Sequence, residues 1–194
     1  MAIRILLGSI VTAIAIPAFA AEESFVVEPV HSQPTFETRH IGMSPQRGNF
    51  GKLSGKVTLD RVEKKGTIEV TIDATSIRTF DARLDAIVKG DRFFNVEKYP
   101  TLTFKSDKVT FDGDRVVGVD GDLTMVGVTK PVSFKVANFV CGENPFNKKA
   151  MCGAEATATI KRSDWGMTNG LNVNNPGDEI KLMIPIEAYK EVAP

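Results

Sequence analysis

The sequence predicts an all-β protein, an antiparallel barrel of about eight strands with one short helix across an end. Apolar and polar residues alternate with a period of two along most of the chain, turn residues separate these segments, and one segment has helical spacing. Strands joined in sequence leave two long edges unless the sheet closes, and closure removes both edges. A β-sandwich is the alternative that this pattern leaves open.

The first 20 residues have the pattern of a secretory signal peptide. Arg4 precedes the apolar stretch 5–16, and Ala18-Phe19-Ala20 is a small-x-small cleavage sequence. The stretch is too short to cross a bilayer as a helix, which takes about 20 residues. We therefore expect residues 1–20 to be removed and residues 21–194 to form one exported domain, with the periplasm as its compartment. A retained membrane anchor is the alternative.

The predicted strands each have one apolar and one polar face, as in an antiparallel sheet with one buried side. In the clearest case, Ile68, Val70 and Ile72 share a face between polar neighbours. Alternation predicts strands at residues 35–40, 48–59, 67–73, 101–110, 115–125, 132–136, 154–162 and 179–186, with a short edge strand at 24–28. Turn residues lie at 63–66, 112–114 and 126–130, where Gly and Asp tolerate positive φ.

Residues 80–90 differ from the rest because Leu84, Ile87 and Val88 recur at helical spacing. This segment predicts a single short helix that ends at Gly90. Residues 163–178 predict a long loop rich in Asn and Gly, which holds the only tryptophan, Trp165. Arg162, just before that loop, is expected either to pair with Asp164 or to stack near Trp165.

Composition and spacing exclude several function classes. The chain has 24 basic and 24 acidic residues, which excludes the basic surface that nucleic acid requires. It has no phosphate loop and no dinucleotide fingerprint. Its two histidines, His31 and His40, have a spacing that matches no metal motif, so we predict no metal site. Adjacent residues on an extended chain point oppositely, so His31 and Ser32 do not form a catalytic pair, and we predict no catalytic residue.

The two cysteines predict a structural disulfide. Cys141 and Cys152 are separated by polar turn residues and lack the tight Cys-x-x-Cys spacing of redox pairs. A reactive thiol pair is the alternative. Closing a loop of this size is worth about 3 kcal/mol in the chain-entropy model.

The barrel interior is predicted to hold a ligand. Ala154, Ala156 and Ala158 lie on one face of a strand and fill little space, although the twelve phenylalanines could occupy the room that they leave. A cavity lined by aliphatic and aromatic side chains suits a long apolar molecule. Each buried methylene contributes about 0.8 kcal/mol, so a dozen give roughly 10 kcal/mol before the costs of association.

Several motifs in order along the chain resemble the YceI-like family of secreted lipid-binding proteins. They are His31-Ser32 with Phe36 and Arg39-His40; Gly48-Asn49-Phe50 with Gly55; Ser76-Ile77-Arg78-Thr79; the run 91–100 with Phe104-Lys105-Ser106; the run 121–131; and the run 162–167. The resemblance implies an extended, eight-stranded, lipocalin-like barrel. It also implies polyisoprenoid, quinone-like or fatty-acid-derived ligands.

We therefore expect a non-catalytic periplasmic carrier of a long apolar lipid, with no cofactor other than that lipid and no stable membrane insertion. A homodimer is one assembly that the sequence leaves open. The alternatives are a secreted enzyme that acts on a lipid-like substrate, and an adaptor that binds another exported protein through the loop 142–151. The candidate ligand-binding residues are Phe36, His40, Phe50, Ile68, Val70, Ile72, Leu84, Phe93, Phe94, Phe104, Phe134, Ala156, Ala158, Trp165, Met167, Leu182 and Ile184. Trp165 and Met167 are expected to gate the cavity from the long loop, and His40 to meet a buried polar partner or a ligand head group.

Overall fold

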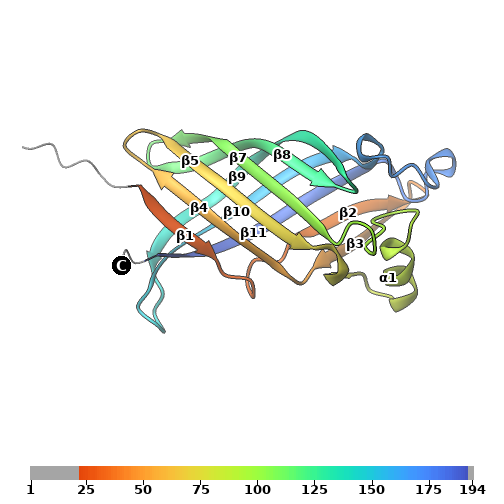
Figure 1. The fold of residues 1–194 in the computed structure, drawn as a ribbon, viewed down its shortest axis with the longest axis horizontal. Helices are drawn as coiled ribbons and strands as arrows, with labels where there is room; N and C mark the ends of the chain where they lie inside the picture. Colours follow the sequence, from red (N-terminus) through yellow and green to blue (C-terminus); the bar gives the residue numbers. More distant parts are fainter. Residues whose placement is uncertain (1–21, 192–194) are drawn as a thin grey trace, which may run out of the picture.

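The computed structural model describes residues 22–191 and confirms an antiparallel, eight-stranded barrel with one α-helix (Figure 1). The predicted signal peptide lies outside the described residues. The barrel strands, in their order around the wall, are β1 (Glu23–Val27), β4 (Leu53–Asp60), β5 (Lys65–Asp73), β7 (Thr101–Asp112), β8 (Arg115–Met125), β9 (Val128–Glu143), β10 (Ala150–Lys161) and β11 (Glu179–Lys190).

Strand β1 closes the barrel, and the expectation of an edge strand here is wrong. Residues Phe25 to Val27 pair with the C-terminal part of β11, and the other edge of β1 pairs with β4. Both edges of this short strand are therefore occupied. Phe25 and Val27 point into the barrel and are buried. Closure satisfies backbone groups that an open sheet would expose to other chains.

The predicted single strand at residues 48–59 is two strands. Here β3 (Ser44–Phe50) ends at Phe50, and β4 begins after Gly51 and Lys52. The two strands belong to different parts of the sheet, because β3 pairs with β2 (Thr35–His40) and β6 (Ile77–Arg78), whereas β4 pairs with β1 and β5. The break is held by the Gly51 N–H, which donates to the Ser76 carbonyl. Alternation continues across the break and so conceals it.

Strands β2, β3 and β6 extend the wall at one end of the barrel. Strand β2 pairs with the N-terminal part of β11, at Lys181 to Met183. It occupies the part of the β11 edge that β1 does not reach. Helix α1 (Ala82–Lys89) follows β6 and lies at this same end, together with the loop 163–178 (Figure 1). The 3-10 helix η2 (Arg162–Trp165) leads into this loop, which also contains η3 (Leu171–Val173); η1 (Ala74–Ser76) links β5 to β6.

Helix α1 forms where its sequence predicts it. The Asp81 side chain accepts a hydrogen bond from the Arg83 N–H at the N-terminus, and the Gly90 N–H donates to the Ile87 carbonyl after the last turn. Every residue of α1 is at least partly exposed. The helix therefore lies on the barrel end without being buried in a core. Among residues 22–191, no helix is long and apolar enough to span a membrane.

Two apolar clusters lie toward opposite ends of the barrel. The cluster near α1 includes Phe50, Leu102 and Trp165, and the cluster at the far end includes Phe25 and Leu59. Gly121 lets strands β7 and β8 approach closely, since a Cβ there would lie 2.4 Å from the Lys105 carbonyl oxygen. Gly127 has a φ of +73° in the β8–β9 turn, as the predicted turn at 126–130 requires.

Candidate functional site: a lipid-sized cavity in the barrel

A cavity of about 630 Å³ occupies the barrel interior and opens beside α1. Its walls are the alternating apolar faces that the sequence predicts, such as Ile68, Val70 and Ile72 of β5. These inward side chains are only half-buried, although they point away from the outer surface. That exposure arises because they face the cavity. The volume lies within the range of about 300–1,000 Å³ that is usual for small-molecule sites.

All but two of the candidate ligand-binding residues line this cavity. The lining members are Phe36, His40, Phe50, Ile68, Val70, Ile72, Leu84, Phe93, Phe94, Phe104, Phe134, Ala156, Met167, Leu182 and Ile184. They come from β2, β3, β5, β7, β9, β10, β11, α1 and the segments that follow α1 and η2. Residues far apart in sequence therefore meet around one space.

Trp165 and Ala158 are the two exceptions. Trp165 is only 2% exposed, and its indole N–H donates to the Leu123 carbonyl at 3.2 Å. It is a core residue behind the wall, so the expectation that it gates the cavity is wrong. Ala158 packs against the same apolar cluster and is not among the lining residues. Local sequence favours both residues as lining residues, but it does not show whether a side chain faces the cavity or packs behind its wall.

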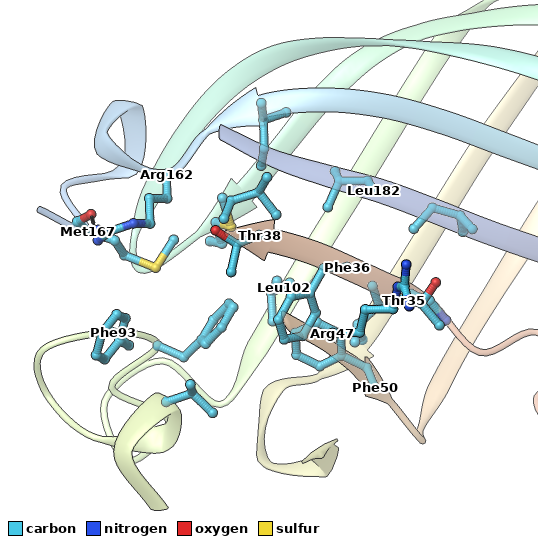
Figure 2. Close-up of a pocket in the computed structure, with 18 of the residues that line it drawn as sticks. Thr35, Phe36, Thr38, Arg47, Phe50, Phe93, Leu102, Arg162, Met167 and Leu182 are labelled. Atoms are coloured by element: carbon cyan, nitrogen blue, oxygen red, sulfur yellow. Dashed lines mark hydrogen bonds between the residues drawn. The ribbon is translucent and has the colours of Figure 1, made fainter. Parts of the chain in front are cut away.

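The phenylalanines line the cavity without filling it. Phe36 and Phe50 lie with ring centres 6.0 Å apart, and Phe94 meets Phe50 edge-on at 5.5 Å. Figure 2 shows Phe36, Phe50 and Phe93 around the space with Leu182 on the opposite side. Rings in contact stabilise one another as part of the wall. The predicted alternative, a barrel plugged by its own aromatic residues, is wrong for this part of the chain.

A second cavity of about 110 Å³ continues from the first toward the far end of the barrel. The two share Ile68, Val70, Val119, Ala156 and Ile186 as lining residues. The second cavity is lined by apolar side chains and Gly153.

An aromatic pair stands between the two halves of the interior. The Phe104 and Phe134 rings meet edge-on at 5.2 Å and pack against both apolar clusters. Together the two cavities and this pair form an apolar interior that narrows with distance from α1.

Polar groups gather at the α1 end of the cavity. The polar lining residues are Thr35, Thr38, His40, Gln46, Arg47, Thr79, Arg162, Asn169 and Asn175. They come from β2, β3, the segment before α1, and Arg162 with the loop that follows it. An amphipathic molecule would match this arrangement with its head at the α1 end and its tail toward the second cavity.

Arg162 is the buried charge of this end, at 2% exposure. Its guanidinium donates to the carbonyls of Gly177, Met167, Asn169 and Pro176, and neither expected partner, Asp164 or Trp165, is among these contacts. Burial lowers the pKa of Arg162, and the nearby charge of Asp178 opposes that shift. The four carbonyls hold the loop 163–178 around the cation. One side of the mouth is thus fixed by a single side chain.

The histidines do not form a shared centre. His40 is exposed at the rim of the cavity, so a buried polar partner for it is not found. His31 lies in the turn after β1, where its Nδ1 is 2.7 Å from a Glu28 carboxylate oxygen. The Ser32 hydroxyl is buried and donates to the Glu187 carbonyl, which leaves it bound to backbone. His31 and Ser32 thus serve different contacts.

Glu28, His31 and Glu187 are close enough to hold a metal ion together. Their nearest ligand atoms lie within 4.8 Å of one another. Glu28 is already engaged, since its carboxylate is hydrogen-bonded to the His31 ring and accepts from the backbone N–H groups of Val30 and His31. We interpret the group as a link between the β1–β2 turn and β11.

The predicted disulfide joins Cys141 and Cys152 on directly paired positions of β9 and β10. Their Cα atoms are 4.0 Å apart, and the Arg61 guanidinium donates to Cys141 Sγ at 3.0 Å. Cys152 also lines the second cavity. The bridge therefore fastens the end of the barrel that lies away from α1.

Several lining residues escaped the sequence prediction. Leu102, Ile160, Ile180 and Ile186 line the cavity and share the inward faces of Phe104, Ala156 and Leu182, so the same alternation could have identified them. The polar residues had no such signal. Arg162, Asn169 and Asn175 reach the cavity because the loop 163–178 folds over its mouth, which no local pattern records.

Known proteins are similar to this chain in sequence and in fold. A family model described as the YceI-like domain matches residues 25–188. The "Protein YceI" of Salmonella arizonae is 33% identical over 175 residues, which cover 90% of each chain.

Two solved structures extend the comparison of fold. Burkholderia cenocepacia BcnA matches with a TM-score of 0.70 at 23% identity, covering 83% of this chain and 98% of that one. A polyisoprenoid-binding domain from Saccharophagus degradans, implicated in plant cell wall breakdown, matches with a TM-score of 0.64 at 13% identity, covering 86% and 98%.

Proposed function

The chain belongs to the YceI-like family, and from that premise we propose that it binds one long-chain apolar lipid, of the isoprenoid class, inside its barrel. The single observation that carries the proposal is the apolar cavity of about 630 Å³ that opens beside α1 and narrows toward the far end. The name of the Saccharophagus degradans domain supports the choice of an isoprenoid.

The geometry favours one orientation of that lipid. The apolar second cavity suits a hydrocarbon tail, since each methylene transferred from water contributes about 0.8 kcal/mol. The polar side chains at the α1 end suit a small head group with oxygen atoms, because the side-chain amides of Asn169 and Asn175 line the cavity and can donate hydrogen bonds. We propose that the head lies at the mouth and the tail points toward Cys152.

We further propose that binding is the whole activity and that the lipid leaves unchanged. The Ser32 hydroxyl, whose pairing with His31 the sequence argued against, is held by the Glu187 backbone and lies outside the cavity lining. Incubating the protein with a defined polyprenol and recovering that polyprenol at unchanged mass supports this. A shifted product mass that appears only with the protein contradicts it.

One substitution tests whether the lipid occupies the interior. Ala156 lines both cavities, and Thr157 beside it is exposed on the outer face of β10. Ala156→Phe places a ring in the passage, whereas the matched control Thr157→Phe places the same ring outside. We expect Ala156→Phe to weaken uptake of a fluorescent polyprenol by more than about tenfold, since burial of several methylenes is lost. Thr157→Phe should bind as the unmodified protein does.

Mass spectrometry of an organic extract identifies the lipid that the purified protein carries. A stoichiometric long-chain lipid in the unmodified protein and its loss in Ala156→Phe support the proposal. Equal uptake by both variants places the lipid outside the barrel. Recovery of no lipid, together with no probe uptake by the unmodified protein, overturns the function itself.

We propose that the protein acts in the periplasm after removal of residues 1–20. The Cys141–Cys152 bridge supports this, because disulfides persist in oxidising compartments. Cell fractionation and the intact mass of the purified protein provide the test. A mature chain that begins at Ala21 in the periplasmic fraction is expected. A full-length chain retained in the cytosol contradicts this part of the proposal alone.

A further inference from the structure

Exposed apolar side chains surround the mouth of the cavity. They come from the β2–β3 turn, from α1 and the residue before its N-cap, and from η3. We call them the apolar rim: Ile41, Met43, Phe80, Leu84, Ile87 and Val173, which are 47%, 77%, 91%, 43%, 54% and 57% exposed. Large exposed apolar patches mark surfaces that meet a protein or a lipid membrane.

The segments that carry the apolar rim lie together at one end of the molecule (Figure 1). The β2–β3 turn touches the loop 163–178, since a Cβ on Gly42 would lie 3.0 Å from the Asn174 amide nitrogen and the Gly177 N–H donates to the Arg39 carbonyl. Arg162, directly before this loop, contacts the segment after α1, since its guanidinium carbon lies 5.8 Å from the centre of the Phe93 ring. The segments that carry the rim are therefore joined to one another at this end of the molecule.

This surface is continuous with the cavity. Phe80, Leu84 and Ile87 are exposed to solvent and also line the cavity. These three side chains thus form an apolar path from the outside of α1 to the interior of the barrel. The helix that carries Leu84 and Ile87 is fixed at its start, because the Asp81 side chain accepts from the Arg83 N–H and Asp85 accepts from the Thr79 hydroxyl.

We propose that the apolar rim docks onto a lipid bilayer, so that a lipid passes between the bilayer and the cavity without crossing water. This inference rests on the proposed function, which supplies the cargo. Each methylene exposed to water during transfer lowers the population of the exposed state about fourfold. A long chain would therefore leave a bilayer very slowly through water. Contact between the rim and the bilayer removes that barrier at the place where the cavity opens.

Charge near α1 is compatible with phospholipid head groups but does not dominate. The segment 78–92 carries the cations Arg78, Arg83, Lys89 and Arg92 and the carboxylates Asp81, Asp85 and Asp91. Arg83 is paired with Asp81 at 2.6 Å, and Asp85 is bound by Thr79. The near balance leaves apolar contact as the main attraction. Docking should then persist on neutral vesicles and in about 1 M salt, where the Debye length falls to about 3 Å.

A second copy of the chain is a less suitable occupant of the rim. Two rims that cover each other would also close the two cavity mouths, so a lipid could not enter. A bilayer covers the rim and delivers the cargo at the same time. Self-association through this face is therefore an outcome that counts against the proposal.

The test compares two pairs of substitutions. Met43→Ser with Val173→Ser removes rim side chains that are not among the cavity-lining residues. Val140→Ser with Phe146→Ser is the matched control, because these side chains are 67% and 94% exposed near the β9–β10 turn at the opposite end of the barrel. Both pairs remove exposed apolar surface and leave the cavity walls unchanged.

Three measurements are made on each protein. Vesicle flotation with phosphatidylcholine, alone and mixed with phosphatidylglycerol, reports docking. Uptake of a fluorescent polyprenol delivered from ethanol reports binding without a membrane. The rate of transfer of the same probe from vesicles, as vesicle concentration rises, reports whether transfer occurs by contact.

We expect the rim pair to lower vesicle affinity and transfer rate about tenfold, and the control pair to change both less than about twofold. Uptake from ethanol should be equal in all three proteins. Docking is overturned if the transfer rate does not rise with vesicle concentration, or if the rim pair and the control pair float equally with vesicles. It is also overturned if the unmodified protein is a dimer that only the rim pair dissociates. If the polyprenol probe delivered from ethanol is not taken up although the protein still floats with vesicles, the proposed function is overturned instead.

Discussion

The guanidinium carbon of Arg162 lies 5.8 Å from the centre of the Phe93 ring. This contact joins the loop 163–178 to the segment after α1 across the mouth of the cavity (Figure 2). A cation over an aromatic face is attracted by the ring quadrupole, more strongly when both groups are shielded from water. Phe93 is buried, and Arg162 has four carbonyl acceptors on its other sides. Both residues line the cavity, so the contact forms part of its wall.

Arg162→Met is expected to destabilise the protein by about 2–4 kcal/mol, because buried carbonyls lose charged donors that methionine cannot replace. Urea unfolding provides the measurement. The matched control is Arg92→Met, since Arg92 is exposed, and it should change the free energy of unfolding by less than about 0.5 kcal/mol. Equal effects of the two substitutions would mean that the carbonyl cage contributes little.

Quenching of Trp165 fluorescence is expected to depend on the position of a quencher along the ligand. Trp165 is the only tryptophan and lies behind Leu123, a residue of the cavity wall. It belongs to η2 at the α1 end, where the head group is proposed to lie. Fatty acids labelled with a nitroxide near the head should quench more strongly than those labelled at the tail tip. The reverse order would show that the lipid enters head first.

Reduction of the Cys141–Cys152 bridge is expected to lower stability and leave the ligand bound. Opening a loop with a sequence separation of 11 removes about 3 kcal/mol, which corresponds to a Tm decrease of roughly 6–12 °C for a chain of this size. The bridge lies away from the mouth, so the head-group contacts remain. Scanning calorimetry with and without reductant measures this. The variant Cys141→Ser with Cys152→Ser should not respond to reductant.

Helix α1 is expected to loosen in acid before the barrel unfolds. The Arg83 side chain lowers the pKa of Asp81, and the Thr79 hydroxyl lowers the pKa of Asp85, each from an ordinary value of 3.8. A lowered folded pKa gives stability that is fully present above 3.8 and is lost as pH falls through the folded value. Hydrogen exchange of the α1 amides across this range measures the effect.

Asp81→Asn separates capping from charge, because asparagine caps a helix but does not titrate here. In this variant, acid should affect α1 exchange less than in the unmodified protein. If acid exposes the α1 amides equally in both proteins, titration of Asp81 is not the cause.

The local pattern of the chain determined which face of each strand is apolar and where α1 begins and ends. Alternation in Ile68, Val70 and Ile72 assigns an inward face by itself, since successive side chains of a strand point to opposite sides. Asp81 and Gly90 bound the helix because capping is a contact between near neighbours. These features depend on residues a few positions apart.

Only the tertiary structure decided how the sheet closes and where the cavity opens. Pairing of Phe25 with Lys190 joins the first strand of the barrel to its last, and no periodicity encodes which strands meet. The split between β3 and β4, the burial of Trp165 and the carbonyl cage of Arg162 arise in the same way. Each depends on segments that are distant in sequence, whose contacts form only once the barrel brings them together.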